Sequence, residues 1–437
     1  MKIRRNFRIA AGVTAAAVVF AACGSSPGSS SPGGSSPGGS GSGAVVEATV
    51  IAYTGTNAFE GGVTDAGAYP AAYEINSAGG ILGHQLNISP IDTRGDPADA
   101  LPAVQKMLAT TGNLVGVTGA GTTSGPTILP VLNGAQMTTM ASAGEAKYDR
   151  NTYPYFWRLV PPDPVNGEAM ALWAKKQGLM RVAAVFGTDS SSQGALPGVL
   201  AGVTRIHASL VANVSLTPDQ PSYRTQVEQV LASHPDVIMT ESDGATGATF
   251  FGEMKQLGHL VPVYGTQGTV TNTWLNPVRS AMGSANFAKY YTAIIGGTPK
   301  PSPALTAYQQ GLKNAASKVP SPYTQWDGNP YAQAFYDGVI VQALAMEAAH
   351  SIKPSVYNKD VMAVTEPGNG KTVVYSFAQG KRDLEAGKQI QYIGASGPIL
   401  FDKYHNSFGN EAAERIPPTG NPTVLGIITE QSIQKLG

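Results

Sequence analysis

The sequence contains 437 residues, of which 42% are hydrophobic, 29 are basic and 29 are acidic. At about 100–200 residues per domain, this length predicts two lobes with substantial cores, and the hydrophobic content excludes a disordered or fibrous chain. Four basic residues lie within residues 1–8, so the rest of the chain has 25 basic and 29 acidic residues, a net charge of −4. A mildly acidic chain lacks the electrostatic footprint that nucleic acid or an anionic membrane surface requires.

Residues 1–22 have the features of an export signal. They begin with a basic segment and continue with an apolar run of about fourteen residues, too short to span a bilayer comfortably, that ends in two alanines directly before Cys23. The segment resembles a lipoprotein signal peptide, although Phe20 stands where that signal has an aliphatic residue. The resemblance implies lipidation of Cys23, which would hold the protein at the extracytoplasmic face of the bacterial cell membrane.

The export route stays open. Arg4, Arg5 and Phe7 fit the core of a twin-arginine signal, but paired arginines also occur in ordinary signal peptides of the general secretory (Sec) route. Residues 23–43 consist almost wholly of Gly, Ser and Pro after the cysteine, a composition that predicts a flexible tether. The folded part is therefore expected to begin near Ala44.

Apolar segments of strand length then alternate with helical stretches. Strands are expected at 48–53, 86–91, 114–118, 181–186, 236–240 and 262–264. A helix is expected at 330–349, a second one behind Ser222 as N-cap, and a third within 65–77 that Pro70 would kink or delay. This alternation predicts an α/β protein with open parallel sheets covered by helices on both faces.

Motifs for catalysis and metal binding are not found. The six histidines are scattered without HExxH spacing, and no GxSxG nucleophile elbow appears between a predicted strand and a predicted helix. The loop 119–124 (GAGTTS) follows a predicted strand and lacks the lysine of a P-loop. Its backbone amides, placed before a helix, could bind an anionic group such as a carboxylate, or the loop could be only a tight strand-to-helix turn. The residues therefore give no support to an enzyme, and they predict no cofactor or metal.

Several segments carry a family resemblance. Residues 76–83 (NSAGGILG), 155–158 (YFWR), 336–339 (YDGV) and 394–402 (GASGPILFD) follow the order of leucine/isoleucine/valine-binding proteins, which the chain resembles over nearly all of 44–437. The resemblance implies the type 1 periplasmic-binding-protein fold, with two Rossmann-like lobes and a three-crossing hinge. It places residues 44–160 and 290–393 in the first lobe, 161–289 in the second, and the hinge return with the rest of the second lobe in 394–437.

The resemblance also implies a ligand site between the lobes, at the carboxyl ends of the strands. In the first lobe, Phe59 would cap the ligand. The residues that would bind the ligand's carboxylate are Thr122, Thr123, Ala141, Ser142 and Ala143. The second-lobe positions of the family's site fall on Gln193, Gln267 and near Asp243.

Gln267 stands where the family has the acidic partner of the ligand's ammonium group. A neutral amide cannot neutralise a buried ammonium, and an unpaired buried charge costs several kcal/mol. Either the ligand lacks an ammonium group, as an amide, a urea-like compound or a carboxylic acid does, or Glu241 or Asp243 supplies the charge. A third interpretation makes these two carboxylates solvated groups at an exposed strand end.

The function implied by the resemblance is solute binding for an ABC importer. The protein would close its lobes over a small polar metabolite as a monomer and then meet the permease and ATPase subunits of the transporter. The alternative is a ligand-sensing receptor domain of the same fold that signals through a membrane partner, because fold alone does not fix function.

Overall fold

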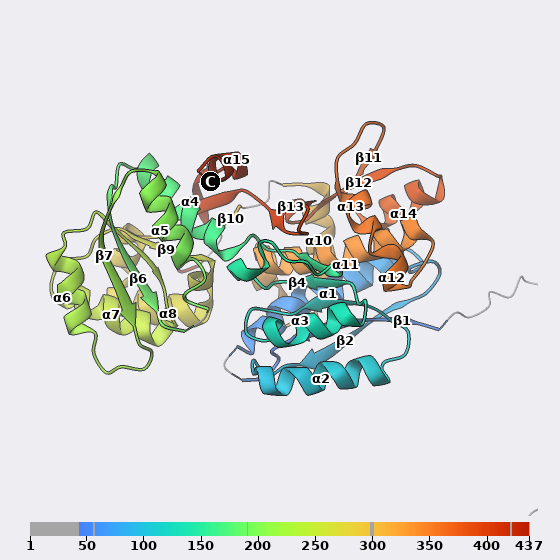
Figure 1. Cartoon of the computed structure of the whole chain (residues 1–437), viewed down its shortest axis with the longest axis horizontal. Coiled ribbons are helices and arrows are strands. Elements are labelled where there is room, and N and C mark those ends of the chain that lie inside the picture. The colour runs from blue at the N-terminus through green and yellow to red at the C-terminus, as the bar shows by residue number, and fades with distance from the viewer. Residues whose placement is uncertain (1–42, 56, 190, 298–300, 420–421, 437) are drawn as a thin grey trace, which may run out of the picture. The chain divides into compact units, whose positions relative to one another are not determined.

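Two open β-sheets organise residues 43–55, 57–189, 191–297, 301–419 and 422–436, the part of the chain that the computed structural model describes (Figure 1). The predicted signal peptide, Cys23 and the tether up to residue 42 lie outside the described residues. Residues 42–437 form one unit, and it contains both sheets.

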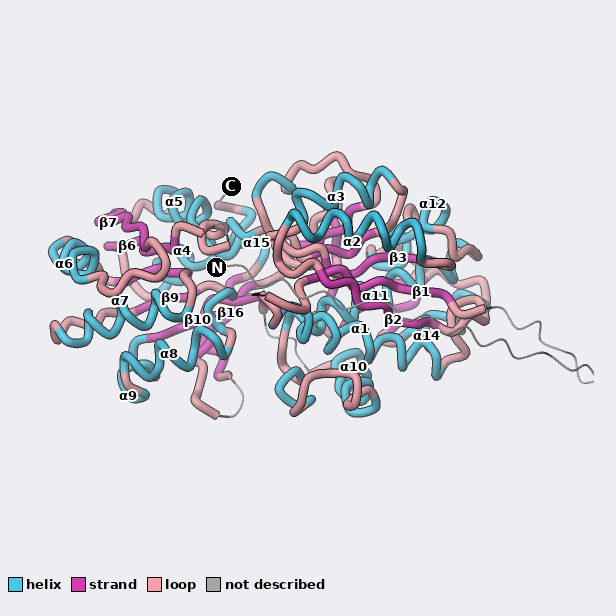
Figure 2. The backbone as a smooth tube through the Cα atoms, turned by 90° about the horizontal axis from the view of Figure 1, so that it is seen from below, coloured by secondary structure: helices cyan, strands magenta, loops and turns pink. Residues whose placement is uncertain are grey.

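The first sheet has five parallel strands in the order β2-β1-β3-β4-β5. The strands are β1 (Val45–Ile51), β2 (Leu86–Asp92), β3 (Leu114–Gly119), β4 (Thr139–Ala141) and β5 (Phe156–Arg158). On one face lie α2 (Pro97–Thr110) and α3 (Gly125–Gly134); on the other lie α1 (Phe59–Ser77), α10 (Pro303–Asn314), α11 (Pro330–Ala349) and α14 (Phe377–Glu385) (Figure 2). The short helices α12 (Pro354–Tyr357) and α13 (Asp360–Thr365) complete this lobe.

The second sheet has seven strands in the order β17-β16-β10-β9-β8-β6-β7. They are β6 (Arg181–Gly187), β7 (Ser209–Leu216), β8 (Val237–Glu241), β9 (Val263–Gly265), β10 (Tyr291–Gly296), β16 (Glu411–Arg415) and β17 (Thr423–Ile428). All neighbouring pairs are parallel except that β16 runs antiparallel to both β10 and β17. Its helices are α4 (Asp163–Lys176), α5 (Leu196–Arg205), α6 (Arg224–Ala232), α7 (Gly244–Gln256), α8 (Asn272–Met282), α9 (Ser284–Tyr290) and α15 (Glu430–Gln434).

The central strands of each sheet are buried on both faces, as their continuous apolar runs predict. In β6, Ala183 and Val185 pack into the core under α6 to α9, whereas Val182, Ala184 and Phe186 pack into the core beside α4 and α5. The first sheet likewise separates a core under α1 and α11 from one under α2 and α3. The predicted α/β architecture with helices on both faces is therefore what the chain forms.

The chain passes between the sheets three times: from β5 to α4, from β10 to α10, and from β15 (Ser407–Phe408) to β16. The predicted boundary at 289/290 falls before β10, yet β10 pairs with β9 and β16 in the second sheet. The predicted boundary at 393/394 also falls early, because β13 (Gly397–Pro398) still pairs with β12 (Ile390–Gly394) beside β11 (Thr372–Val374), and β14 (Leu400–Phe401) with β15. Short strands of this kind give no sequence signal that tells which sheet they join.

Arg158 lies where the first and third crossings meet. Its side chain is fully buried, and Nη1 lies 2.8 Å from Asp149 Oδ1. Its backbone amide donates to the carbonyl oxygen of His405 at 2.9 Å, and the ring of His405 stacks on Trp157 with 3.8 Å between ring centroids. Arg158 and His405 thus belong to the hinge.

Two of the resembling segments, 336–339 and 394–402, are in contact in the fold. Asp337, fully buried in α11, accepts hydrogen bonds from the hydroxyl of Tyr392, from the backbone amides of Ala395 and Ser396, and from the Ser396 hydroxyl at 2.5–2.8 Å. A side chain at Gly394 would collide with this carboxylate, because an added Cβ would lie 2.3 Å from its Oδ2. The hairpin that begins at residue 394 is therefore held to the first lobe by one carboxylate.

Local expectations had mixed outcomes. The helix at 330–349 is confirmed as α11. The prediction that Pro70 would delay its helix is wrong, since α1 begins at Phe59 and runs through Pro70 to Ser77. The helix expected behind Ser222 is α6; its N-cap residue is Tyr223, which makes no side-chain cap hydrogen bond, and the Ser222 hydroxyl accepts from the Arg224 amide at 3.2 Å as predicted for a cap.

Removing the Asp337 carboxylate leaves the Tyr392 hydroxyl and two backbone amides without their buried acceptor. We expect Asp337→Ala to lower the free energy of unfolding by about 3 kcal/mol, because each buried donor left unpaired costs about 1–3 kcal/mol. Urea denaturation with an unchanged m-value measures this loss. Asp99→Ala is the control, since Asp99 pairs only with exposed Arg94 at 3.7 Å; an equal loss in both variants would contradict the assignment.

Candidate ligand-binding site

The first-lobe loops of the site are tied together at the carboxyl ends of β1, β3 and β4. The Ala120 amide donates to the Val50 carbonyl at 2.7 Å, and the Ser142 amide donates to the Gly119 carbonyl at 3.0 Å. Ala120 itself is buried and adopts a left-handed conformation with φ of 55°. Such strained positions cluster at functional sites, and here the left-handed conformation lets the chain turn sharply at the end of β3.

The predicted residues Thr122, Thr123 and Ser142 lie in these loops. Thr123 Oγ1 accepts from Asn57 Nδ2 at 3.3 Å, and within the described residues the backbone amides of Thr122 and Thr123 donate to no protein acceptor. Of the other two predicted positions, Ala141 is the last residue of β4, and Ala143 follows two residues later; both are fully buried and can offer only backbone atoms.

Glu60 joins this group from the first turn of α1, a residue that the sequence interpretation did not include. A Cβ at Gly121 would lie 3.4 Å from Glu60 Oε2 and 3.6 Å from Ser142 Oγ, so both side chains flank this glycine. Burial raises the pKa of Glu60 to about 7. Phe59, the predicted cap, begins the same helix and is 44% exposed.

In the second lobe, Glu241 lies at the end of β8. Its Oε2 accepts from Thr266 Oγ1 at 2.6 Å, and its Oε1 lies 2.2 Å from the position of a Cβ on Gly268. Burial raises the pKa of Glu241 to about 8, the Thr266 hydrogen bond opposes this, and the charges of Asp163 and Asp189 add to it. Glu241 therefore has one oxygen without a hydrogen-bond partner among the described residues.

Asp163 is the acid at the first crossing, also absent from the predicted set. Its amide donates to the Gly144 carbonyl at 2.8 Å, and its carboxylate lies between Gly144 and Gly194, where an added Cβ would approach it to 1.9 and 2.5 Å. Burial raises the pKa of Asp163 to about 7; the charge of Glu145 adds to this shift and that of Arg158 opposes it. One carboxylate thus contacts loops of both lobes.

Tyr331, the second residue of α11, marks where these acids converge. Burial and the charges of Asp163, Glu241, Glu411 and Glu60 all raise the pKa of its phenol well above the usual value. Charges act on a group this way only when they are close to it and poorly screened. Carboxyl groups from the first lobe, the crossing and the second lobe therefore all lie near enough to this phenol to act on its pKa.

The three other predicted second-lobe residues differ in the hydrogen bonds that their side chains already make. Asp243 caps α7, because its Oδ1 accepts from the amides of Ala245 and Thr246 at 3.0 and 2.9 Å, and its side chain is exposed. Gln193 donates from Nε2 to the Gly187 carbonyl. Gln267 is half-buried at the start of a short 3-10 helix (Gln267–Val270), directly before the glycine that contacts Glu241.

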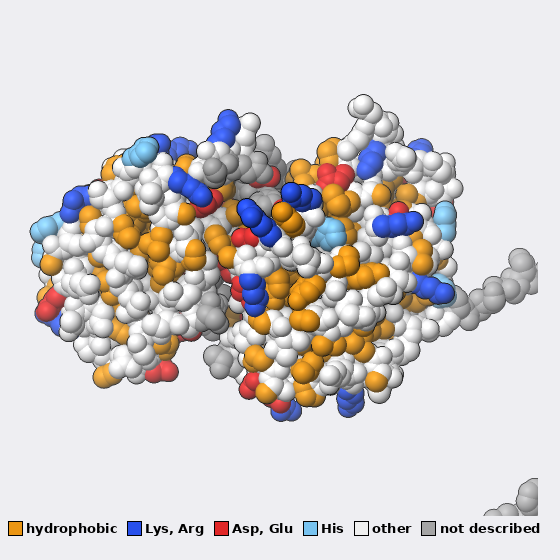
Figure 3. Space-filling model, in the orientation of Figure 1, with side chains coloured by type: hydrophobic (Ala, Val, Ile, Leu, Met, Phe, Trp, Pro, Cys, Tyr) orange, Lys and Arg blue, Asp and Glu red, His pale blue; other side chains and the backbone are white. Residues whose placement is uncertain are grey.

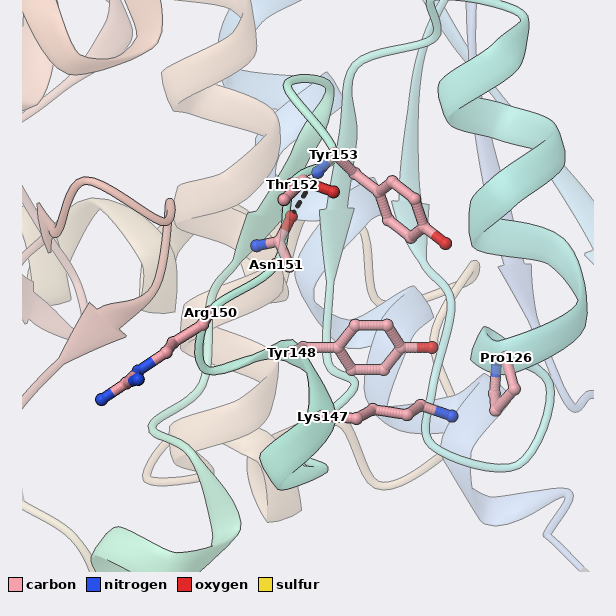
Figure 4. A pocket seen from close by; sticks show the side chains of 7 residues that line it. All are labelled: Pro126, Lys147, Tyr148, Arg150, Asn151, Thr152 and Tyr153. Atoms are coloured by element: carbon pink, nitrogen blue, oxygen red, sulfur yellow. Dashed lines mark hydrogen bonds between the residues drawn. The ribbon is translucent and has the colours of Figure 1, made fainter.

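A hollow lies on the first lobe beside the start of α3. It has a volume of about 330 Å³, and the segment 147–153 lines it opposite Pro126 (Figure 4). Tyr148 and Lys147 extend toward Pro126, whereas Arg150 points the other way (Figure 4). Lys147 lies over the Tyr148 ring at 4.9 Å and pairs with Glu145 at 3.6 Å, so its charge is already engaged.

Other kinds of site find no support in the described ranges. They contain no group of three or more His, Cys, Asp or Glu side chains that could hold a metal ion. Nor does any described helix combine the length and apolar character needed to cross a membrane. Basic and acidic side chains are mixed on the face shown in Figure 3, as the near balance of charges in the sequence predicts.

Solved structures share this fold at low sequence identity. A leucine binding protein from Thermotoga maritima matches with a TM-score of 0.68 and 16% identity over 89% of this chain and 99% of its own. A branched-chain amino acid transporter substrate binding protein from Streptococcus pneumoniae, in complex with isoleucine, gives 0.68 and 14% over 88% and 99%. A solute binding protein of an ABC transporter from R. palustris, in complex with benzoate, gives 0.67 and 15% over 88% and 96%.

Sequence comparison identifies the family. No curated protein matches the chain. The sequence profile of the family described as periplasmic binding protein matches residues 48–405, most of the described part. With two lobes, parallel sheets and three crossings, the predicted type 1 fold is confirmed, and the chain belongs to the periplasmic binding protein family.

Proposed function

We propose that the protein is the extracytoplasmic solute-binding component of an ABC importer and that it binds a small polar metabolite between its lobes. The family match supports this proposal, together with Glu60 in the first lobe and Glu241 in the second, whose charges both raise the pKa of Tyr331. A ligand that contacts both lobes stabilises the closed arrangement by its differential affinity, and the permease then recognises that arrangement. No chemical step is needed.

The ligand carries an ammonium group, and Glu241 is its partner. Asp243 is unsuited to this role because its carboxylate already caps α7. Among the described residues, one oxygen of Glu241 has no hydrogen-bond partner, and the charges that act on its pKa are those of Asp163 and Asp189, both acidic. A cationic group would compensate this carboxylate, so the neutral side chain of Gln267 does not require a ligand without an ammonium.

The ligand's carboxylate binds at the first lobe. The unengaged amides of Thr122 and Thr123 and the hydroxyl of Ser142 are the donors for it, placed just before α3, whose N-terminus favours negative charge. Leucine and isoleucine, named for two of the related structures, carry both groups, whereas benzoate carries only the carboxylate. An amino acid is therefore the ligand class that uses both halves of the site.

Glu241→Gln tests the ammonium partner. We expect the affinity for an amino-acid ligand to fall by about 10- to 100-fold, because a hydrogen bond to a charged group contributes about 1.5–3 kcal/mol. Ligand-induced thermal shifts across amino acids, amides, ureas and carboxylic acids identify the ligand, and calorimetry gives its Kd. Asp243→Asn is the matched control, since asparagine also caps helices. Stabilisation only by ligands without an ammonium would overturn this assignment.

The pH dependence of binding gives a second test. Glu241 must lose its proton to pair with an ammonium, and burial raises its pKa to about 8. Affinity for an amino acid should therefore increase as the pH rises from 6 to 8, by up to about tenfold per pH unit, and level off above that. Measuring the affinity across this pH range in wild type and in Glu241→Gln separates the contribution of Glu241 from those of Glu60 and Asp163. An equal slope in both proteins would argue against Glu241.

We further propose that Cys23 is lipidated and anchors the protein to the cell membrane after removal of residues 1–22. The sequence order of basic segment, apolar run, small residues and cysteine supports this. Cys23→Ala should move the protein from the membrane fraction to the soluble fraction without changing ligand affinity, as measured by fractionation and calorimetry. A soluble wild-type protein that lacks acyl chains by mass spectrometry would refute the anchor.

A further inference from the structure

One buried side chain connects the segments next to all three crossings. Asn166 lies in α4, which follows the first crossing, and is 1% exposed. Its Nδ2 donates to the carbonyl oxygen of Ile294 in β10, which precedes the second crossing, at 2.8 Å. The same nitrogen donates to Oε2 of Glu411, the first residue after the third crossing, at 2.9 Å. The Gly297 amide also donates to the Asn410 carbonyl at 2.5 Å.

The remaining side-chain oxygens of Asn166 and Glu411 can form a hydrogen bond with each other only if one of them carries a proton. Asn166 Oδ1 and Glu411 Oε1 are both buried and have no partner among the described residues. An amide oxygen accepts hydrogen bonds but cannot donate, and a carboxylate oxygen likewise only accepts. A protonated carboxyl can instead form two parallel bonds with a primary amide: amide N–H to acid C=O, and acid O–H to amide C=O.

The surroundings of Glu411 favour the neutral acid. Glu411 is fully buried, and burial raises the pKa of its carboxyl to about 7 while the Asn166 hydrogen bond lowers it. From α11 it faces the phenol of Tyr331, and one turn before Asn166 in α4 stands the acid Asp163. In the neighbouring strands, β10 has Tyr291 as its only titratable side chain and β17 has none. No described basic group shifts the pKa of Glu411.

We propose that Glu411 and Asn166 form a proton-dependent clamp of the hinge, in which neutral Glu411 donates to Asn166 while accepting from it. Loss of the proton breaks one of the two bonds and leaves a buried carboxylate beside the amide oxygen. The joint of α4, β10 and β16 is then weakened at the point where the chain passes between the lobes. This clamp does not depend on the identity of the ligand.

The direction of the pH effect follows from the higher pKa in the folded state. Between the ordinary value of 4.5 and about 7, the folded protein keeps a proton that the unfolded chain has lost. The stability that the clamp provides is thus complete below pH 4.5, is lost as the pH rises toward 7, and stays lost above it.

Glu411→Gln is the decisive variant, because a glutamine amide makes both bonds with Asn166 at every pH. We expect the unfolding equilibrium constant of wild type, relative to Glu411→Gln, to increase by up to about tenfold per pH unit between 4.5 and 7 and then to stay constant. Denaturant unfolding at pH 4.5, 6, 7 and 8 measures this ratio. Glu228→Gln, an exposed change on α6, is the control and should give a ratio independent of pH. A pH-independent ratio for Glu411→Gln overturns the proposal.

Asn166→Asp keeps the test available if Glu411→Gln does not fold. This change places two carboxyl groups in contact, so they must share a proton, and their mutual repulsion grows as the pH rises. We expect the variant to approach wild-type stability at pH 4.5 and to unfold at markedly lower denaturant concentration at pH 8. A deficit of the same size at both pH values would show that Asn166 acts only through packing.

Discussion

The buried guanidinium of Arg158 determines how the charged groups are arranged where the two lobes meet. A buried cation without a partner costs several kcal/mol, and Asp149 at 2.8 Å and the Glu145 carbonyl at 3.1 Å supply the compensation. The same positive charge opposes the effect of burial on the pKa of Asp163, five residues further along the chain. The ligand site and the hinge are therefore parts of one electrostatic arrangement.

Much of the fold could be predicted from sequence because its signals are local. Strands buried on both faces leave uninterrupted apolar runs, as in β6, and α11 has the bounds that its apolar spacing indicates. The order of the resembling segments was informative for a physical reason: the Asp337 carboxylate in one segment holds the backbone amides of another, nearly sixty residues later.

The site could be predicted only in part, since its residues come from distant segments. The sequence indicates the first-lobe loops and Glu241 as candidates because they follow strands that the sequence identifies. Glu60 and Asp163 were missed because each stands at a helix start with no local mark of burial; Tyr331 resembles any aromatic residue of a core helix. Asp243 was overvalued because a carboxylate before a helix is equally a cap.

The strand order of the second sheet has a consequence for how the chain folds. Strand β10 borders β9 on one side and, on the other, β16, which lies more than a hundred residues later. Until residues 411–428 are available, one edge of β10 stays unpaired, and unpaired strand edges are prone to association with other chains. The first lobe likewise needs α11 to cover its sheet. Each lobe thus includes a segment that is synthesised late. Neither lobe can finish folding until nearly the whole chain has been made.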